Sequence, residues 1–341
     1  MKYAKFGVRF ILKLVLSAAI LALPVLAQNP PYLATSSNLV PAVVPVAAGV
    51  SAAVSNDTNN EEPLLTIHKR VDEVHLLFIA TDKHGHFVKN LAQNDFSILD
   101  DNKPPQSILA FRRETDMPIQ VGFMIDVSGS IRSRFNFEQQ SAVGFLQRVL
   151  RPGFDQAFVI GFNGHSQLMQ DFTDNIGALS QGIHRMHSGG GTALYDAIYK
   201  ACKEKLLNRA SDRPTRRALI LLSDGEDNQS DFSREAAIEM AQRAEVIIYT
   251  ISTDDSPSVQ RGDRVLQQIA EATGGRAFNP ASLKDITRSF AAIEDELRSQ
   301  YVVSYKPAEF DADGRYRAIE VSTLKKELRV RARKGYYAPR Q

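Results

Sequence analysis

The chain has 341 residues, of which 43% are hydrophobic and 23% charged, with a formal net charge of +2. This length predicts about two globular domains, at roughly 100–200 residues per domain. The near-neutral balance argues against the strongly basic surface that nucleic-acid binding needs. The single cysteine, Cys202, excludes an internal disulfide, and we expect it to be a small buried residue of a helix.

Residues 1–27 are typical of a cleavable secretory signal peptide. An apolar run from Leu14 ends in small residues at Val25-x-Ala27, and four basic residues precede it: Lys2, Lys5, Arg9 and Lys13. The run is shorter than the roughly 20 residues that span a bilayer, so a retained anchor is the weaker alternative. We therefore expect export to the periplasm or the extracellular space, with no stable transmembrane span after cleavage. Losing the four basic residues changes the formal charge from +2 to −2.

Residues 28–62 are rich in Pro, Ala, Ser and Asn and predict a flexible linker. Residues 63–115 then show short strand-like runs around turn signals, which favours a small β-sheet or sandwich. One of these turns carries His84 and His86 on either side of a glycine. An H-x-H pair can bind zinc, but no cysteine or third histidine is near, so a solvated hairpin tip is the favoured interpretation.

Residues 116–300 alternate apolar strands with helical segments. The runs "IQVGFMID", "QAFVIGFN", "RRALILLSD" and "AEVIIYTIS" are almost continuously apolar, which predicts a parallel sheet covered by helices on both faces. Residues 167–172 are polar enough for an edge strand. A last helix over 283–298 places apolar residues at spacings of three and four. The predicted fold class is α/β, a doubly wound and mostly parallel sheet whose ligands gather at the carboxyl ends of its strands.

Residues 301–341 return to strand-like patterns, separated by a turn at residues 311–314. A tail of this length has little core of its own, so we expect it to pack with residues 63–115. The α/β domain would then be inserted between the two halves of one β-sandwich-like domain.

Polar residues follow the first and fourth strands of the predicted α/β sheet. The first strand ends in Asp126-x-Ser128-x-Ser130, the fourth ends at Asp224, and Thr192 follows three glycines at a helix start. In a doubly wound sheet these segments flank the point where strand order reverses, so we expect their side chains to converge. Two carboxylates and three hydroxyls are hard oxygen ligands that suit Mg²⁺, while Ca²⁺ or Mn²⁺ is also allowed.

The D-x-S-x-S, G-G-T and S-D-G-E motifs in this order resemble the metal-ion-dependent adhesion site (MIDAS) of von Willebrand factor A (VWA) domains. The segments on either side, including "YVVSYKP" and "VRARKGYY", resemble secreted bacterial VWFA-related proteins of the acidobacterial type. The resemblance implies that Ser128 and Ser130 bind the metal directly, Thr192 does so when ligand is bound, and Asp126 and Asp224 act mostly through water. It also implies a non-enzymatic adhesion module that binds an acidic side chain of a protein partner. Nucleotide binding is not expected, because the sequence has no G-x-x-x-x-G-K-[ST] motif.

Other functions compete with this interpretation. An envelope assembly or scaffold protein would use the same metal site with a different partner. A serine hydrolase would use Ser128 or Ser130 as nucleophile, with a base from His165, His184 or His187, but "DVSGS" is not a G-x-S-x-G elbow.

Two further features are expected to be structural. The tripeptide Arg261-Gly262-Asp263 could be an integrin-recognition motif, but it precedes a helix, where Gly and Asp serve as start signals. Glu226 and Asp227 could adjust the charge at the metal site, and a solvated acidic loop is the favoured alternative.

Overall fold

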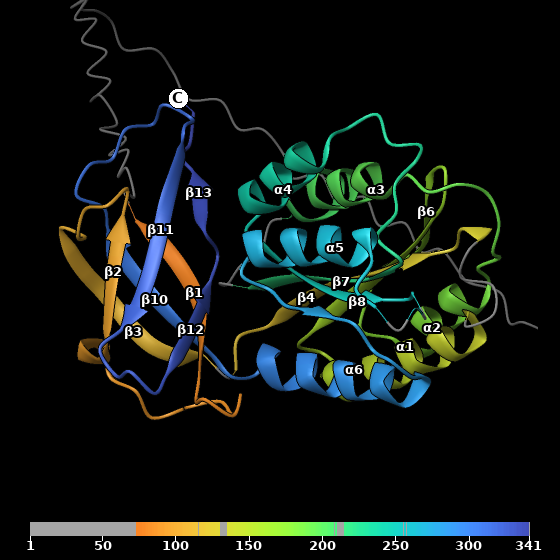
Figure 1. The fold of residues 1–341 in the computed structure, drawn as a ribbon, viewed down its shortest axis with the longest axis horizontal. Coiled ribbons are helices and arrows are strands. Elements are labelled where there is room, and N and C mark those ends of the chain that lie inside the picture. Colours follow the sequence, from red (N-terminus) through yellow and green to blue (C-terminus); the bar gives the residue numbers. More distant parts are fainter. Residues whose placement is uncertain are drawn as a thin grey trace, which may run out of the picture. The chain divides into compact units, whose positions relative to one another are not determined.

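The computed structural model describes residues 73–114, 116–129, 135–207, 209, 215–254, 256 and 258–340. All of them belong to one compact unit, which contains an α/β part and a β part (Figure 1). The predicted signal peptide and linker lie outside the described residues. Within the described ranges, no helix is both long and apolar enough to span a membrane.

The α/β part is built on a six-stranded sheet in the order β6-β5-β4-β7-β8-β9. All neighbouring strands run parallel except β6, which is an antiparallel edge strand. The first strand, β4, lies beside both the second and the fourth, so the strand order reverses where the sequence predicts it. The strands are β4 Ile119–Asp126, β5 Gln156–Phe162, β6 Ser166–Thr173, β7 Arg216–Ser223, β8 Val246–Ser252 and β9 Ala277–Phe278.

Helices cover both faces of this sheet (Figure 1). Every residue of β4 and β8 is buried, as the continuous apolar runs predict. On β4, Phe123 faces one core, with α1, α2 and α6, and Met124 faces the other, with α3, α4 and α5. The helices are α1 Phe135–Val149, α2 Ile176–His184, α3 Leu194–Lys200, α4 Arg234–Arg243, α5 Arg261–Ala272 and α6 Leu283–Leu297. A π-helical segment, Ala201–Leu207, extends α3 and buries Cys202 completely, as expected.

The β part consists of two antiparallel sheets, in the orders β12-β1-β10-β3 and β13-β11-β2. The strands that precede the α/β part pair with the strands that follow it, β1 with β10 and β2 with β11, which confirms the predicted packing of the two flanking segments. The strands are β1 Val74–Thr81, β2 Phe96–Asp100, β3 Ser107–Glu114, β10 Gln300–Lys306, β11 Tyr316–Thr323, β12 Arg329–Ala332 and β13 Gly335–Tyr337, and a short 3₁₀ helix, η1 Gln93–Asp95, precedes β2.

A buried carboxylate ties the two sheets of the β part together. Asp100, at the end of β2, accepts hydrogen bonds from the hydroxyls of Tyr305 on β10 (2.8 Å) and Tyr336 on β13 (3.1 Å). Burial raises the pKa of Asp100, although both hydroxyls act in the opposite direction. The predicted hairpin tip near His84 is exposed, and His86 contacts Asp82 there at 3.0 Å.

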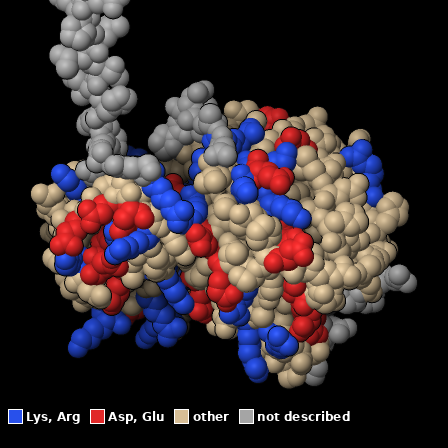
Figure 2. Space-filling view, turned by 90° about the horizontal axis from the view of Figure 1, so that it is seen from above, with Lys and Arg blue, Asp and Glu red and all other residues tan. Residues whose placement is uncertain are grey.

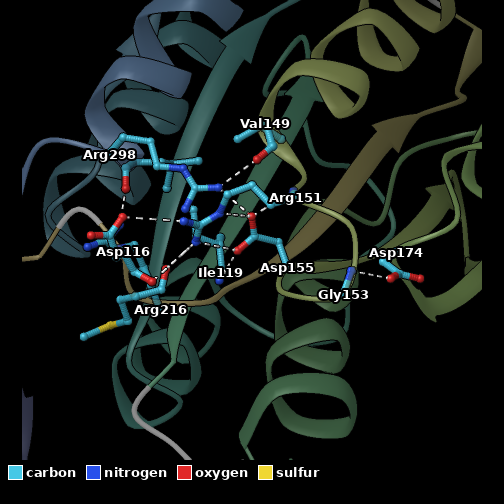
Figure 3. Close-up of polar contacts among 11 residues, drawn as sticks. Asp116, Ile119, Val149, Arg151, Gly153, Asp155, Asp174, Arg216 and Arg298 are labelled. Carbon is cyan, nitrogen blue, oxygen red and sulfur yellow. Dashed lines mark hydrogen bonds and ion pairs between the residues drawn. The ribbon is translucent and has the colours of Figure 1, made fainter.

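A second buried carboxylate, Asp155, holds the amino-terminal end of the α/β sheet (Figure 3). It accepts hydrogen bonds from the backbone of Ile119 on β4 (2.9 Å), from Arg151 after α1 (3.0 Å) and from Arg298 after α6 (2.6 Å). Burial alone would raise the pKa of Asp155, but these hydrogen bonds outweigh it and lower the pKa. Nearby, Arg216 on β7 donates to the carbonyl of Leu297 at the end of α6.

Candidate metal centre

Asp126 is the last residue of β4, at the carboxyl end of the parallel sheet, and it is fully buried. The backbone N–H of Ser128 donates to its Oδ1 (2.8 Å), and the hydroxyl of Ser223 donates to its Oδ2 (2.7 Å). Ser223 ends β7, and the pairing of Ile125 with Leu222 brings the two strand ends side by side. The parallel register therefore positions this carboxylate among hydroxyl groups.

The surroundings of Asp126 disfavour its ionised form. Burial raises the pKa of Asp126 to about 6, the hydrogen bonds from Ser128 and Ser223 oppose this shift, and the charge of Asp224 adds to it. Among the described residues, no Lys, Arg or His side chain is a hydrogen-bond or ion-pair partner of this carboxylate. A cation beside Asp126 and Asp224 would reverse the shift, because an opposite charge favours the ionised form.

Three loops meet at this end of the sheet through backbone contacts. The N–H of Gly129 donates to Gly190 (3.2 Å), and the N–H of Gly189 donates to Val127 (2.6 Å), which joins the loop after β4 to the glycine loop. Thr192 in turn donates to Oδ1 of Asn228 (2.9 Å) and accepts from the backbone of Asn228 (3.0 Å) in the loop after β7.

Four of the five predicted site residues therefore lie at a strand end or on loops that the structure brings together. Asp126, Ser128 and Thr192 are buried, and Asp224 is partly buried. Ser130 lies outside the described residues. Sequence reasoning missed Ser223 and Asn228, whose role depends on neighbours that are distant in the chain. Ser223 had one signal, its position directly before Asp224.

Two glycines bring the Asp224 loop against the start of α5. A Cβ on Gly262 would overlap the carbonyl of Asp224, and one on Gly225, whose φ is +77°, would overlap the carbonyl of Gly262. Asp263 is 5% exposed and accepts from the backbone N–H of Gln260 (2.8 Å) in a capping box. The Arg-Gly-Asp sequence is thus a packed helix start, which confirms the structural interpretation.

The acidic residues after Asp224 differ in their surroundings. Glu226 is exposed, as expected of a solvated acidic loop. Asp227 is partly buried, and its Oδ2 accepts from the hydroxyl of Ser230 (2.5 Å) and the backbone N–H of Tyr195 (3.2 Å). Asp227 therefore anchors this loop to the first turn of α3.

The donor set fits a hard divalent cation and no soft one. Among the described residues, no group of three or more His, Cys, Asp or Glu side chains could hold a metal ion. An ion at this end of the sheet would depend on two carboxylates and on serine and threonine hydroxyls. Neutral and anionic oxygen ligands of this kind suit Mg²⁺, Ca²⁺ or Mn²⁺.

The histidines considered as catalytic bases lie in two different places, at the end of α2 and in a hollow beside Val127. His184 ends α2, and its ring contacts the carbonyl of Ser180 at 2.7 Å. His165 and His187 line a hollow of about 190 Å³ beside Val127. Ser128 itself donates to Asp126 through its backbone and its side chain. The arrangement seen around Ser128 is thus a hydroxyl on a buried carboxylate, whereas a nucleophilic serine needs a base oriented by a third group.

Charged side chains of both signs are interspersed on the face shown in Figure 2. Uncharged residues dominate the right of that view, which is the α/β part. This face therefore presents no extended surface of one sign that would attract a polyanion.

A family model of the von Willebrand factor type A domain matches residues 120–292, slightly more than half of the chain. The chain is 25% identical over 203 residues to a UPF0353 protein of Mycobacterium avium, a match that covers 52% of this chain and 60% of that protein. It is 24% identical over 202 residues to a UPF0353 protein of Mycobacterium tuberculosis, with the same coverage of 52% and 60%. The chain thus spans about 60% of the length of these curated relatives.

Two solved structures resemble the fold. A von Willebrand factor type A protein from Catenulispora acidiphila has a TM-score of 0.47 and 11% identity, and the match covers 79% of this chain and 74% of that one. Proximal thread matrix protein 1 from the mussel byssus, solved with zinc in its MIDAS motif, has a TM-score of 0.46 and 18% identity, covering 56% and 49% of the two chains.

Proposed function

Because the chain belongs to the von Willebrand factor type A domain family, we propose that it is an exported, non-enzymatic module that binds a protein partner through a divalent metal ion. The β part would serve as a structural support for the metal-binding α/β domain, which extends from about residue 116 to about residue 300. Export depends on the signal peptide predicted over residues 1–27.

The environment of the Asp126 carboxylate carries this proposal. It is fully buried at the end of the central strand, hydrogen-bonded to serine groups and close to a second carboxylate. A buried acid normally pairs with a cationic side chain, because an unpaired buried charge is costly. Here a bound cation would supply that charge.

Ser128, Ser130 and Thr192 would hold the ion through their hydroxyls, and Asp126 and Asp224 would balance its charge. The ion would act as a Lewis acid that attracts a carboxylate of the partner, and no proton transfer is required. The chain's own contribution is to orient the hydroxyls, which the contacts between Asp126, Ser128 and Ser223 support. We propose Mg²⁺ as the ion, with Ca²⁺ or Mn²⁺ as alternatives.

Titration calorimetry with Mg²⁺ tests the site. We expect the wild type to bind Mg²⁺ and Asp126→Ala to lose this binding. Asp311→Asn is a matched control, because it removes the same charge at an exposed position of the β part. Equal heats for wild type and Asp126→Ala would refute the site.

Capture of partners from the native envelope, with and without EDTA, tests the function. We expect EDTA and Ser128→Ala to release the same partner, because both remove the metal. If the captured complex persists after EDTA, the metal does not mediate the contact. An envelope assembly protein is the second candidate, and it is favoured if the partner is a stable component of a larger complex. A hydrolase would instead lose turnover in Ser128→Ala.

A further inference from the structure

A cavity of about 420 Å³ lies between the four-stranded sheet of the β part and the α/β part. Its volume is within the range of roughly 300–1,000 Å³ found for small-molecule sites, which often lie between domains. Arg217, at the start of β7, lines it, whereas Ser223 at the other end of β7 belongs to the candidate metal centre. Six residue-to-residue steps along the strand, from Arg217 to Ser223, separate the two sites by about 20 Å.

One wall of the cavity is apolar. Leu77 on β1 pairs with Val302 on β10, and both side chains lie on the face of the sheet that is turned away from the sandwich core. Apolar side chains of the α/β part line the cavity as well: Met117, Val246 and Ile247. This wall offers a surface to the hydrocarbon part of a ligand.

Basic residues border the apolar wall. Arg112 on β3 pairs with Val302, Arg217 pairs with Val246 of β8, and Arg333 directly follows β12. All three line the cavity, and Glu245 is the only acidic side chain among the described residues that line it. Among these described residues, guanidinium groups therefore outnumber carboxylates three to one.

The hydrogen bonds of two of these arginines leave their charge largely uncompensated. Arg217 donates to the carbonyl oxygens of Ala244 (3.2 Å) and Arg209 (3.3 Å), which are neutral. Arg333 donates to the carbonyl of His75 (2.8 Å) and contacts the carboxylate of Glu245 at 3.4 Å. Strong charge-assisted hydrogen bonds measure about 2.7–2.9 Å, so the contact with Glu245 is a weak one.

Glu245 occupies an unusual backbone position. It follows α4 with a φ of +53°, where glycine is the usual residue. This left-handed conformation is strained for a residue with a side chain. The side chain of Glu245 is 55% exposed, so a ligand carboxylate could replace it at Arg333 without burying it.

We propose that this cavity binds a small amphipathic carboxylate, such as a medium-chain fatty acid. The guanidinium groups of Arg112, Arg217 and Arg333 hold the carboxylate, and the hydrocarbon chain lies against Leu77 and Val302. Arginine is suited to this role because its planar fork matches a carboxylate with two hydrogen bonds. The site is separate from the candidate metal centre and needs no metal.

Titration calorimetry of the full chain with decanoate, in EDTA and below the concentration at which decanoate aggregates, tests the proposal. Decan-1-ol and decylamine are matched probes with the same hydrocarbon chain and a neutral or cationic head. We expect decanoate to bind at least tenfold more tightly than either. Absence of decanoate binding, or equal binding of decan-1-ol, would overturn the proposal.

Substitutions then locate the ligand. Arg112→Gln and Arg333→Gln should each weaken decanoate binding about tenfold, because each removes a charged hydrogen-bond donor. Arg329→Gln is the matched control, since this exposed arginine of β12 does not line the cavity. Circular dichroism melting of each variant shows that it is folded. Two folded variants that bind as the wild type does, or an equal loss in Arg329→Gln, would contradict the assignment.

Discussion

Asp155→Ala tests how the amino-terminal end of the α/β sheet is held. The side chain of Asp155 is fully buried and accepts five hydrogen bonds, two from backbone N–H groups and three from guanidinium groups. The alanine variant leaves all five donors without this acceptor. Because the donors come from β4, from Arg151 just after α1 and from the residue after α6, their loss should weaken the packing of three elements (Figure 3).

The expected loss in the free energy of unfolding of Asp155→Ala follows from how exposed each hydrogen-bond donor is. The backbone N–H groups of Ile119 and Arg151 lose their partner, at about 1 kcal/mol each, the low end for a buried donor. The side chains of Arg151 and Arg298 are 37% and 22% exposed, so water partly replaces the carboxylate and each guanidinium loses about 0.5 kcal/mol. The total is about 3 kcal/mol in the free energy of unfolding.

Urea unfolding followed by far-UV circular dichroism measures this loss, since the chain has no tryptophan. Asp174→Asn is the control, because Asp174 accepts one hydrogen bond, from Gly153 (2.7 Å), and the asparagine oxygen can still accept it. We expect that control to lose less than about 1 kcal/mol. A loss below 1 kcal/mol in Asp155→Ala, or one equal to that of the control, would refute the reasoning.

The pH dependence gives an independent check of the same residue. The pKa of Asp155 is lowered in the folded protein, so its contribution to stability is present above the unfolded-state pKa of about 3.9 and is lost as the pH falls through the folded-state pKa. The stability difference between wild type and Asp155→Ala should therefore be largest above about pH 4 and should shrink at lower pH. A difference that grows on acidification would contradict the hydrogen-bond pattern.

Three further substitutions test separate parts of the molecule. Gly144→Ala, within α1, should stabilise the fold by about 0.5–1 kcal/mol in urea unfolding, because its Cβ would meet only Arg148 at 3.6 Å. Gly262→Ala should weaken Mg²⁺ binding in calorimetry, because the new Cβ displaces the Asp224 loop. Circular dichroism should still show a folded chain. An unchanged affinity for Mg²⁺ would show that the Asp224 loop does not contribute to metal binding. Tyr305→Phe should lower the free energy of unfolding by about 1–2 kcal/mol, because the buried carboxylate of Asp100 loses a hydrogen-bond donor. An unchanged free energy of unfolding would show that this hydrogen bond does not stabilise the fold.

The secondary structure was predictable where the local pattern of apolar and polar residues indicates which segments are buried. Continuous apolar runs predicted β4, β5, β7 and β8, and the polar run at residues 167–172 predicted an edge strand, β6. Its antiparallel direction was not predicted. The helix α2 was missed, although Asn175 caps it by accepting from Ala178. Nine residues carry too little periodicity to separate a short helix from a loop.

Features that depend on distant partners were not predictable in the same way. The run over residues 328–337 suggests one strand but forms two, because β12 pairs with β1 in one sheet and β13 pairs with β11 in the other. The candidate metal residues were identified because a family motif fixes their order. Ser223 belongs to the S-D-G-E motif, but its hydrogen bond to Asp126 joins residues 97 positions apart, and that of Asp155 to Arg298 joins residues 143 positions apart, so neither contact has a local signal.

The two ends of the α/β sheet hold buried aspartates in opposite environments. At the amino end, Asp155 is hydrogen-bonded to two arginines and its pKa is lowered, so side chains of the protein itself compensate its negative charge. At the carboxyl end, Asp126 has serine donors and a neighbouring carboxylate, and its pKa is raised. Both are buried acids on the same fold, so burial alone does not separate structure from function. The compensating charge does: among the described side chains no cationic group bonds to Asp126, and the proposed metal ion would supply that charge.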